Sequence, residues 1–264
     1  LISTYFQAKV DQDAQMLYKV FGKEEDDRIE ERKQQLNQNL MLFFTGFSRF
    51  SSDIQQTTEK ALVDKLKELN ASVGVAVLME VATGEVKAIV NMMKAADGNY
   101  YEMRNNAISD MLEPGSTFKT ASIMVALEDG HITPDYEVDT GNGIKMMYGR
   151  PMKDWNWHRG GYGRINVTRI LEVSSNVGTS SIIDQFYHDN PQKFVDGLKR
   201  MSIDQPLHLQ IAGEGKPNIR GPKERYFAKT TLPWMSIGYE TQVPPMNILT
   251  FYNAIANDGV MVRP

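Results

Sequence analysis

The chain has 264 residues, of which 41% are apolar and 23% are charged, and its formal net charge is −4. These values are typical of a folded globular protein and exclude a disordered or fibrous one. The slightly acidic balance also argues against nucleic acid as a partner, because phosphate binding needs a concentrated basic surface.

Several classes of site and segment are excluded by composition. There is no cysteine, which excludes disulfides and thiolate metal sites. No run of about 18 apolar residues occurs, so we predict no membrane-spanning helix. The histidines are scattered without the spacing of metal ligands, so we expect neither a metal nor a cofactor; they are His131, His158, His188 and His208.

The first predicted elements are helical. Residues 23–38 are densely charged without proline or glycine, which is typical of an exposed helix. Residues 51–53 form a helix-starting cluster, and apolar residues then recur at helical spacing as far as Leu69. Asn70 is suited to end this helix.

The pattern then changes to that of strands. Residues 73–81 and 85–90 are rich in β-forming residues and are joined through a short turn that contains Gly84. This predicts a β-hairpin. A helix followed by an apolar hairpin predicts an α+β fold, an α/β sandwich in which helices flank an antiparallel sheet.

The remaining chain predicts further helices and one more strand. Residues 91–114 have a mixed, largely polar composition, which predicts a long connecting segment between the hairpin and the next helix. Helices are predicted from the apolar periodicity and from glycine stops at 116–129, 165–173, 177–186 and 245–257. The last residues, 261–264, are typical of a strand. Because the chain also begins without methionine or a signal segment, we expect it to be part of a longer protein.

The strongest local motif is Glu-Pro-Gly-Ser-Thr-Phe-Lys at residues 113–119. A serine hydroxyl needs a nearby base to become a nucleophile. Lys119 is on the same helical face as Ser116 because residues i and i+3 are neighbours. Ser116 is predicted at a helix N-terminus, which favours negative charge and disfavours an ammonium on Lys119. Alone, Ser-x-x-Lys is expected about once by chance in a chain of this size.

A second motif, Ser-Ser-Asn-Val-Gly, occupies residues 174–178. A second hydroxyl can relay a proton, and an amide side chain can bind a peptide carbonyl. Alone, these residues would be read as a polar turn or a helix cap. The two motifs together, in this order and each at a helix junction, indicate a catalytic site.

The two motifs resemble boxes that recur in penicillin-binding proteins and serine β-lactamases. Residues 113–119 resemble the nucleophile box of class B penicillin-binding proteins, the monofunctional peptidoglycan D,D-transpeptidases, and residues 174–178 resemble their second box. Further segments are similar to other parts of the family's domain: residues 53–55 to the domain entry, residues 77–90 to the first hairpin, and residues 236–239 and 254–260 to the region before the third box. The resemblance covers roughly residues 51–264.

This resemblance implies a role for each site residue. Ser116 is the acylated nucleophile, Lys119 its general base and Ser174 a proton relay. Asn176 and Ser175 bind substrate, and the backbone N–H of Ser116 supplies half of the oxyanion hole. The implied substrates are stem peptides that end in D-Ala-D-Ala, and β-lactams would acylate the same serine.

The resemblance also implies surroundings and partners. The family acts at the periplasmic face of the bacterial inner membrane, so an N-terminal anchor absent from this chain is expected. A membrane glycosyltransferase and other division or elongation proteins are expected partners, and nucleic acid is not. Whether the role is in the septal or the lateral wall is left open.

Two departures from the family pattern bear on the expected domains. The Lys-Thr-Gly box is missing, since Lys229-Thr230-Thr231 lacks the glycine. We therefore expect a transpeptidase domain over 51–264 that is truncated at its C-terminus and is weakly active or inactive. Residues 1–50 are expected to be a largely helical remnant of the N-terminal non-catalytic module. Glu240 stands where many relatives have glycine, and the sequence does not explain it.

Two alternatives stay open at this point. A β-lactamase or β-lactam sensor of the same superfamily would share Ser116 and Lys119, and measurable turnover of penicillin would identify it. A catalytically disabled scaffold is the alternative from another class, which the missing third box favours.

Overall fold

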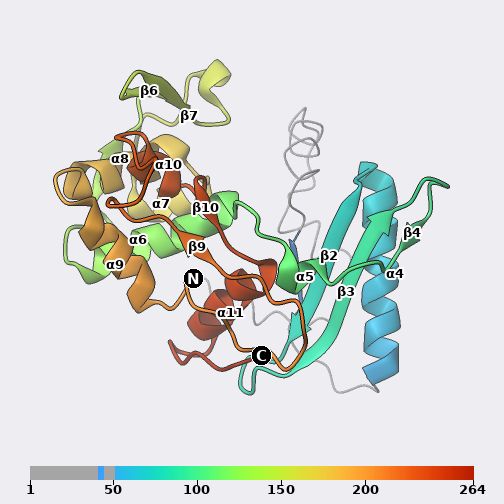
Figure 1. Cartoon of the computed structure of the whole chain (residues 1–264). Coiled ribbons are helices and arrows are strands. Elements are labelled where there is room, and N and C mark those ends of the chain that lie inside the picture. Colours follow the sequence, from blue (N-terminus) through green and yellow to red (C-terminus); the bar gives the residue numbers. More distant parts are fainter. Residues whose placement is uncertain (1–40, 45–50) are drawn as a thin grey trace. The chain divides into compact units, whose positions relative to one another are not determined.

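The computed structural model describes residues 41–44 and 51–264, which fall into two compact units (Figure 1). The first unit contains the described residues up to Asp110, together with Leu207–Glu214 and Pro245–Pro264. The second contains Met111–Pro206 and Gly215–Pro244. The predicted helix at 23–38 lies outside the described residues, and so does most of the expected N-terminal remnant.

The first unit is built on a four-stranded sheet in the order β1-β2-β3-β4. The predicted hairpin is confirmed, because β2 (Val73–Met79) and β3 (Val86–Lys94) pair antiparallel. The hairpin is continued by β4 (Tyr100–Tyr101), also antiparallel. Only β1 (Met41–Phe44), paired parallel to β2, departs from the predicted antiparallel pattern within the described sheet.

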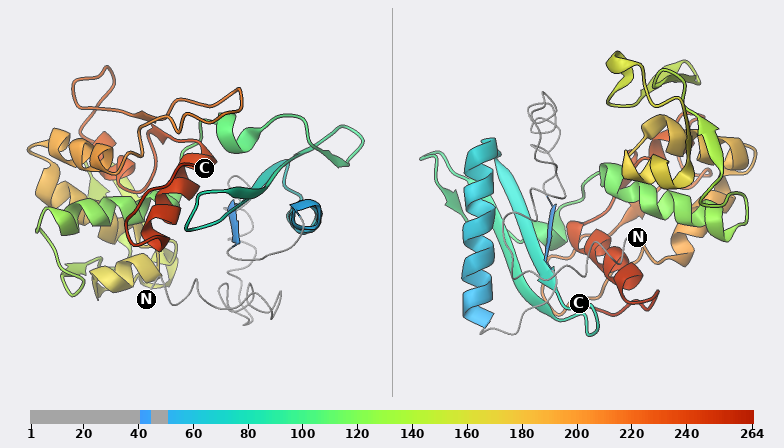
Figure 2. Two further views of the ribbon diagram at one scale, coloured as in Figure 1. Left: turned by 90° about the horizontal axis from the view of Figure 1, so that it is seen from below. Right: turned by 180° about the vertical axis from the view of Figure 1, so that it is seen from behind.

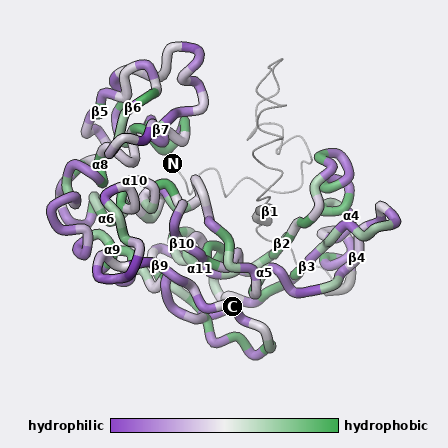
Figure 3. The backbone as a smooth tube through the Cα atoms, turned by 45° about the horizontal axis from the view of Figure 1, so that its top comes forward, coloured by the Kyte–Doolittle hydropathy of each residue, from purple (hydrophilic) through white to green (hydrophobic). Residues whose placement is uncertain are grey.

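Helices cover both faces of this sheet, as predicted. Successive side chains of a strand point to opposite faces. Ala76 of β2 therefore packs with Leu62 and Leu66 of α4 (Ser51–Leu69), which is seen end-on beside the sheet in the left view of Figure 2 and lengthwise along it in the right view. Figure 3 colours much of β2 as hydrophobic, and every residue of this strand after Val73 is buried.

The opposite face of β2 packs against two other helices. Val75 and Val77 contact residues of α5 (Asn106–Ser109) and of α11 (Pro245–Ala256). Fully burying a side chain of this size stabilises the fold by roughly 1.5–3 kcal/mol. The predicted helix at 245–257 is thereby confirmed as a core element.

Two boundary predictions for this unit had different outcomes. Asn70 ends α4 in the left-handed conformation with φ of 50°, and the N–H of Ala71 donates to the carbonyl of Leu66 at 3.0 Å. The predicted strand at 261–264 was wrong, because these residues have no regular structure. A strand needs a partner for its backbone groups, and these residues pair with no strand in the described part of the chain.

The second unit is mainly helical. Its helices are η2 (Gly115–Phe118), α6 (Lys119–Glu128), η3 (Trp157–Arg159), α7 (Val167–Glu172), α8 (Asn176–Tyr187), α9 (Pro191–Arg200) and α10 (Thr231–Met235). Three antiparallel ribbons accompany them: β5 (Glu137–Asp139) with β8 (Arg164–Asn166), β6 (Ile144–Met147) with β7 (Arg150–Lys153), and β9 (Asn218–Ile219) with β10 (Thr241–Gln242). Helices α6 and α8 confirm the predictions, whereas α7 begins two residues late because 164–166 pair with β5. Across the described residues, no helix is both long enough and apolar enough to cross a membrane.

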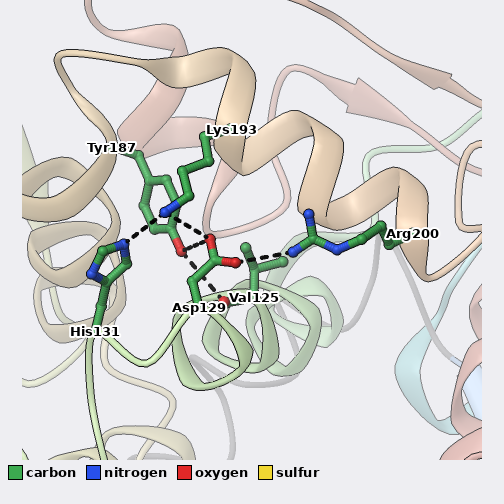
Figure 4. A network of polar contacts seen from close by, with 6 residues as sticks. All are labelled: Val125, Asp129, His131, Tyr187, Lys193 and Arg200. Carbon is green, nitrogen blue, oxygen red and sulfur yellow. Dashed lines mark hydrogen bonds and ion pairs between the residues drawn. The ribbon is translucent and has the colours of Figure 1, made fainter.

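The C-terminal end of α6 is tied to α8 and α9 by a polar network (Figure 4). The Asp129 carboxylate, whose side chain is 11% exposed, accepts a hydrogen bond from Tyr187 at 2.9 Å. The same carboxylate pairs with Arg200 at 3.1 Å and with Lys193 at 3.7 Å. A buried carboxylate with several partners of this kind holds its elements firmly. The network therefore fixes one end of the helix whose other end carries Lys119.

Candidate active site

The predicted nucleophile lies in a tight turn that leads into α6. Ser116 is exposed within η2, and Lys119, the first residue of α6, is only 2% exposed. The backbone N–H of Lys119 donates to the carbonyl of Ser116. In a 3₁₀ turn the side chains at i and i+3 eclipse each other. The local geometry therefore directs Ser116 and Lys119 to one face, as the motif predicted.

A second segment, which contains Gly238, holds this turn in place through a backbone hydrogen bond. The N–H of Gly115 donates to the carbonyl of Gly238 at 3.0 Å. Gly238 has φ of 84°, and a Cβ on it would lie 2.0 Å from the carbonyl oxygen of Gly115. No residue other than glycine fits so close an approach. The position of the nucleophile turn thus depends on a residue more than a hundred positions later in the chain.

The same segment explains how Glu240 is accommodated. Its φ of 56° lies in the left-handed region, where glycine is the least strained residue. Its N–H donates to the Glu113 carboxylate at 2.8 Å, and its own carboxylate accepts from the Thr231 hydroxyl at 2.6 Å. These two bonds help to hold Glu240 in this conformation, next to the nucleophile motif.

The Lys119 ammonium points toward the second motif. Its Nζ donates to the carbonyl oxygen of Ser174 at 2.6 Å and to the Ser174 hydroxyl at 2.9 Å. Burial lowers the pKa of Lys119 from 10.5 to about 7, and the negative charge of Asp154 opposes that shift. A substantial fraction of Lys119 is therefore neutral near pH 7, which a general base requires.

Ser174 occupies the junction between α7 and α8 in an uncommon conformation. Its φ is 54°, in the left-handed region, and its side chain is exposed. The next residue is held back onto α7, because the N–H of Ser175 donates to the carbonyl of Ile170 at 2.9 Å. Strained residues of this kind cluster at functional sites. The junction thus brings the Ser174 hydroxyl to Lys119.

The two predicted substrate contacts in this motif have different surroundings. Asn176 is half-buried, and its Nδ2 donates to the carbonyl of Lys153 at 2.8 Å. Ser175 is fully buried, and its hydroxyl caps α8 by accepting from the N–H of Gly178 at 2.8 Å. A hydroxyl without an exposed face cannot touch a substrate, so the role predicted for Ser175 is replaced by a positioning one.

Asp154 was missed by the sequence reasoning. It is 1% exposed, and both of its oxygens accept from the Ser175 hydroxyl at 3.0 Å. Burial raises the pKa of Asp154, while hydrogen bonds from Val177, Ser175 and Asn176 oppose this shift. No spacing rule joins residues that are 21 positions apart in an irregular loop, so no sequence signal was available.

The arrangement suits acyl transfer. An exposed serine lies one turn before a partly neutral lysine, and that lysine is hydrogen-bonded to a second hydroxyl that can pass a proton on. In the described part of the chain no three histidine, cysteine or acidic residues gather closely enough to hold a metal ion.

Comparison with known proteins gave consistent matches. The family described as "Penicillin binding protein transpeptidase domain" matches residues 74–264. The peptidoglycan D,D-transpeptidase FtsI of Buchnera aphidicola subsp. Schizaphis graminum is 29% identical over 214 residues, which are 78% of this chain and 35% of that protein. FtsI of Escherichia coli K12 is 29% identical over 206 residues, 74% of this chain and 33% of that protein.

A solved structure agrees with these sequence matches. The transpeptidase domain of penicillin-binding protein 3 from Burkholderia pseudomallei aligns with a TM-score of 0.67 at 27% identity, covering 82% of this chain and 60% of that one. The chain therefore spans about a third of the length of the two FtsI relatives and 60% of the length of the solved transpeptidase domain.

Proposed function

The chain belongs to the penicillin-binding protein transpeptidase domain family. We propose that it is the catalytic domain of a peptidoglycan D,D-transpeptidase, which cross-links stem peptides through a serine acyl-enzyme. The proposed donor is a peptide that ends in D-Ala-D-Ala. β-Lactams are proposed to acylate the same serine and to remain bound.

The proposed reaction begins with proton transfer. Neutral Lys119 accepts the proton of the Ser116 hydroxyl while the oxygen attacks the carbonyl carbon between the two D-alanines. The backbone N–H of Ser116 stabilises the negative oxygen that forms. The C–N bond then breaks, and D-Ala leaves as an amine that receives its proton through Ser174.

The second half of the reaction reverses these roles. The peptidyl group is held as an ester on Ser116 until the amine of a neighbouring stem peptide attacks it. The proton of that amine passes through Ser174 and Lys119 back to the Ser116 oxygen. The products are the cross-linked peptide and free Ser116. In this proposal Asn176 orients the peptide backbone, while Ser175 supports the turn.

One observation carries the proposal more than any other. The buried Lys119, with its pKa lowered to about 7, is hydrogen-bonded to Ser174 and follows an exposed serine by one turn. A lysine on a solvated surface would be charged at neutral pH and would not accept the proton.

The wider setting is proposed from the family. The complete protein would act outside the inner membrane, held there by an N-terminal anchor. Partners would include a membrane glycosyltransferase and proteins of division or elongation. The relatives named FtsI are consistent with such a role in wall synthesis.

The test is covalent labelling with a fluorescent penicillin, read by intact mass. Because the missing third box is expected to leave the domain weakly active, we expect one adduct to form slowly on the unmodified chain and none to form on Ser116→Ala. Ser72→Ala, which changes another exposed serine, is the matched control and should label normally. If the chain and Ser116→Ala both remain unlabelled, the proposal fails for this chain. If the adduct forms and is rapidly hydrolysed, a β-lactamase replaces the transpeptidase.

A further inference from the structure

Asp154 holds the start of α8 through several hydrogen bonds. Its Oδ1 accepts from the N–H of Val177 at 2.9 Å, and both of its oxygens accept from the Ser175 hydroxyl at 3.0 Å. The N–H of Asn176 also donates to this carboxylate. The free N–H groups and the dipole at the N-terminus of a helix stabilise such a negative charge. The carboxylate therefore fixes the first residues of α8.

The loop that carries Asp154 also holds the other residues of the second motif. The carbonyl of Lys153 accepts from Asn176, and Lys119 holds Ser174 from the other side. The left-handed conformation of Ser174 costs of order 1–3 kcal/mol and persists only when the surroundings fix it. Residues 153–154 are thus one of the supports of this turn, together with Lys119 and the backbone of α7.

We propose that Asp154 is a positioning residue of this site, which fixes the turn at residues 174–176 and places a negative charge near Lys119. The inference rests on the proposed function, because the reaction that Asp154 would support is the proposed acyl transfer. The titration that tests the inference can be measured without that reaction.

The charge of Asp154 acts on the general base. The Asp154 carboxylate is held beside the second motif, to which Lys119 also donates, and its negative charge favours the charged form of Lys119. Burial lowers the pKa of Lys119, and the negative charge of Asp154 works against that shift. Removal of the charge should therefore lower the pKa of Lys119 further and make the ammonium less stable.

The test compares two substitutions of Asp154. Asp154→Asn keeps the size of the side chain and an oxygen that can accept from Val177, but it removes the charge. The titration of Lys119 Nζ is followed by NMR in protein with isotope-labelled lysine, and the missing signal of Lys119→Met assigns the resonance. We expect the midpoint to move to lower pH in Asp154→Asn, and the acid limb of penicillin acylation to move with it.

Asp154→Ala removes the charge and the support together. Acylation should then fall on the order of 10²-fold at every pH, because small misplacements of catalytic groups have costs of that size. A residue that contributes only to stability would change neither the midpoint of Lys119 nor the acid limb of the rate profile.

Asp129→Asn is the matched control. Asp129 is also a carboxylate of low exposure with hydrogen-bonded partners, and it lies at the far end of α6. Ten residues of helix separate it from Lys119 by about 15 Å. This variant should lose stability while the titration of Lys119 stays at the wild-type midpoint.

The outcomes are decisive in either direction. A wild-type midpoint for Lys119 in Asp154→Asn would overturn the inference. If that variant does not fold, the carboxyl carbon of Asp154 in the unmodified chain should show a step at the midpoint of Lys119, and a flat signal there overturns the inference as well. Neither measurement needs acylation. A chain that fails to label with penicillin would therefore refute the proposed function, and the titration would still test this inference.

Discussion

Gly238→Ala tests whether the nucleophile turn depends on its bracing segment. The new Cβ would lie 2.0 Å from the carbonyl oxygen and 2.6 Å from the nitrogen of Gly115. Neither atom can rotate away, since both belong to the backbone next to Ser116. An L-residue in the left-handed region costs about 1–2 kcal/mol, and overpacking adds about 1–3 kcal/mol. We expect a total loss of about 2–5 kcal/mol and a displaced turn.

Gly130→Ala separates the two contributions. Gly130 ends α6 with φ of 71° and has no atom within 4 Å of its would-be Cβ. It should therefore show only the conformational cost of about 1–2 kcal/mol, a fall in Tm of roughly 2–8 °C for a unit of this size. Thermal unfolding followed by circular dichroism measures both variants.

The rate of penicillin labelling then tests the link to function. Gly238→Ala should label more slowly, on the order of 10²-fold, because the hydroxyl of Ser116 moves with the turn. Gly130→Ala should label at the wild-type rate. Equal stability losses in the two variants, or a wild-type labelling rate in Gly238→Ala, would show that the close approach to Gly115 does not set the geometry of the site.

Three further predictions concern the base, the relay and the core. Since the pKa of Lys119 is lowered from 10.5 to about 7, the unfolded state binds more protons between these two pH values, and stability should rise with pH there by up to about 1.4 kcal/mol per unit. Urea unfolding should show this rise in the wild type and less of it in Lys119→Met. Ser174→Ala should slow labelling about 10²–10⁴-fold while its Tm stays close to that of the wild type, and unchanged kinetics would exclude a relay. Leu66→Ala, at a side chain that is 0% exposed, should cost about 2–5 kcal/mol in urea unfolding, whereas Met103→Ala at an exposed site should cost no more than about 0.5 kcal/mol.

Local physics made much of this protein predictable from its sequence. The period of two in the strands and of 3.6 in the helices predicted the hairpin of β2 and β3 and the helices α4, α6, α8 and α11. The spacing of Ser116 and Lys119 predicted their common face for the same reason, because three residues make about one turn. Asn70 was predicted as a helix end because left-handed geometry there suits its side chain.

Contacts between distant segments were decided by tertiary structure alone. Lys119 and Ser174 are 55 residues apart, and Glu113 and Glu240 are 127 apart. The sequence suggested a role for the first pair through its motifs, but it carried no signal for the second. The start of α7 was predicted two residues too early, because residues 164–166 pair with β5 instead.

Asp154 shows most clearly where reasoning from the sequence ends. An isolated aspartate in a loop is usually solvated, and its neighbours in the sequence do not distinguish it. Only folding buries it against the N-terminus of α8, where Ser175 and two backbone N–H groups satisfy its oxygens and where its charge acts on Lys119. Periodicity encodes which face a residue occupies on its own element. The electrostatics of a buried charge depend on the elements that pack around it, and their arrangement is set by the whole fold.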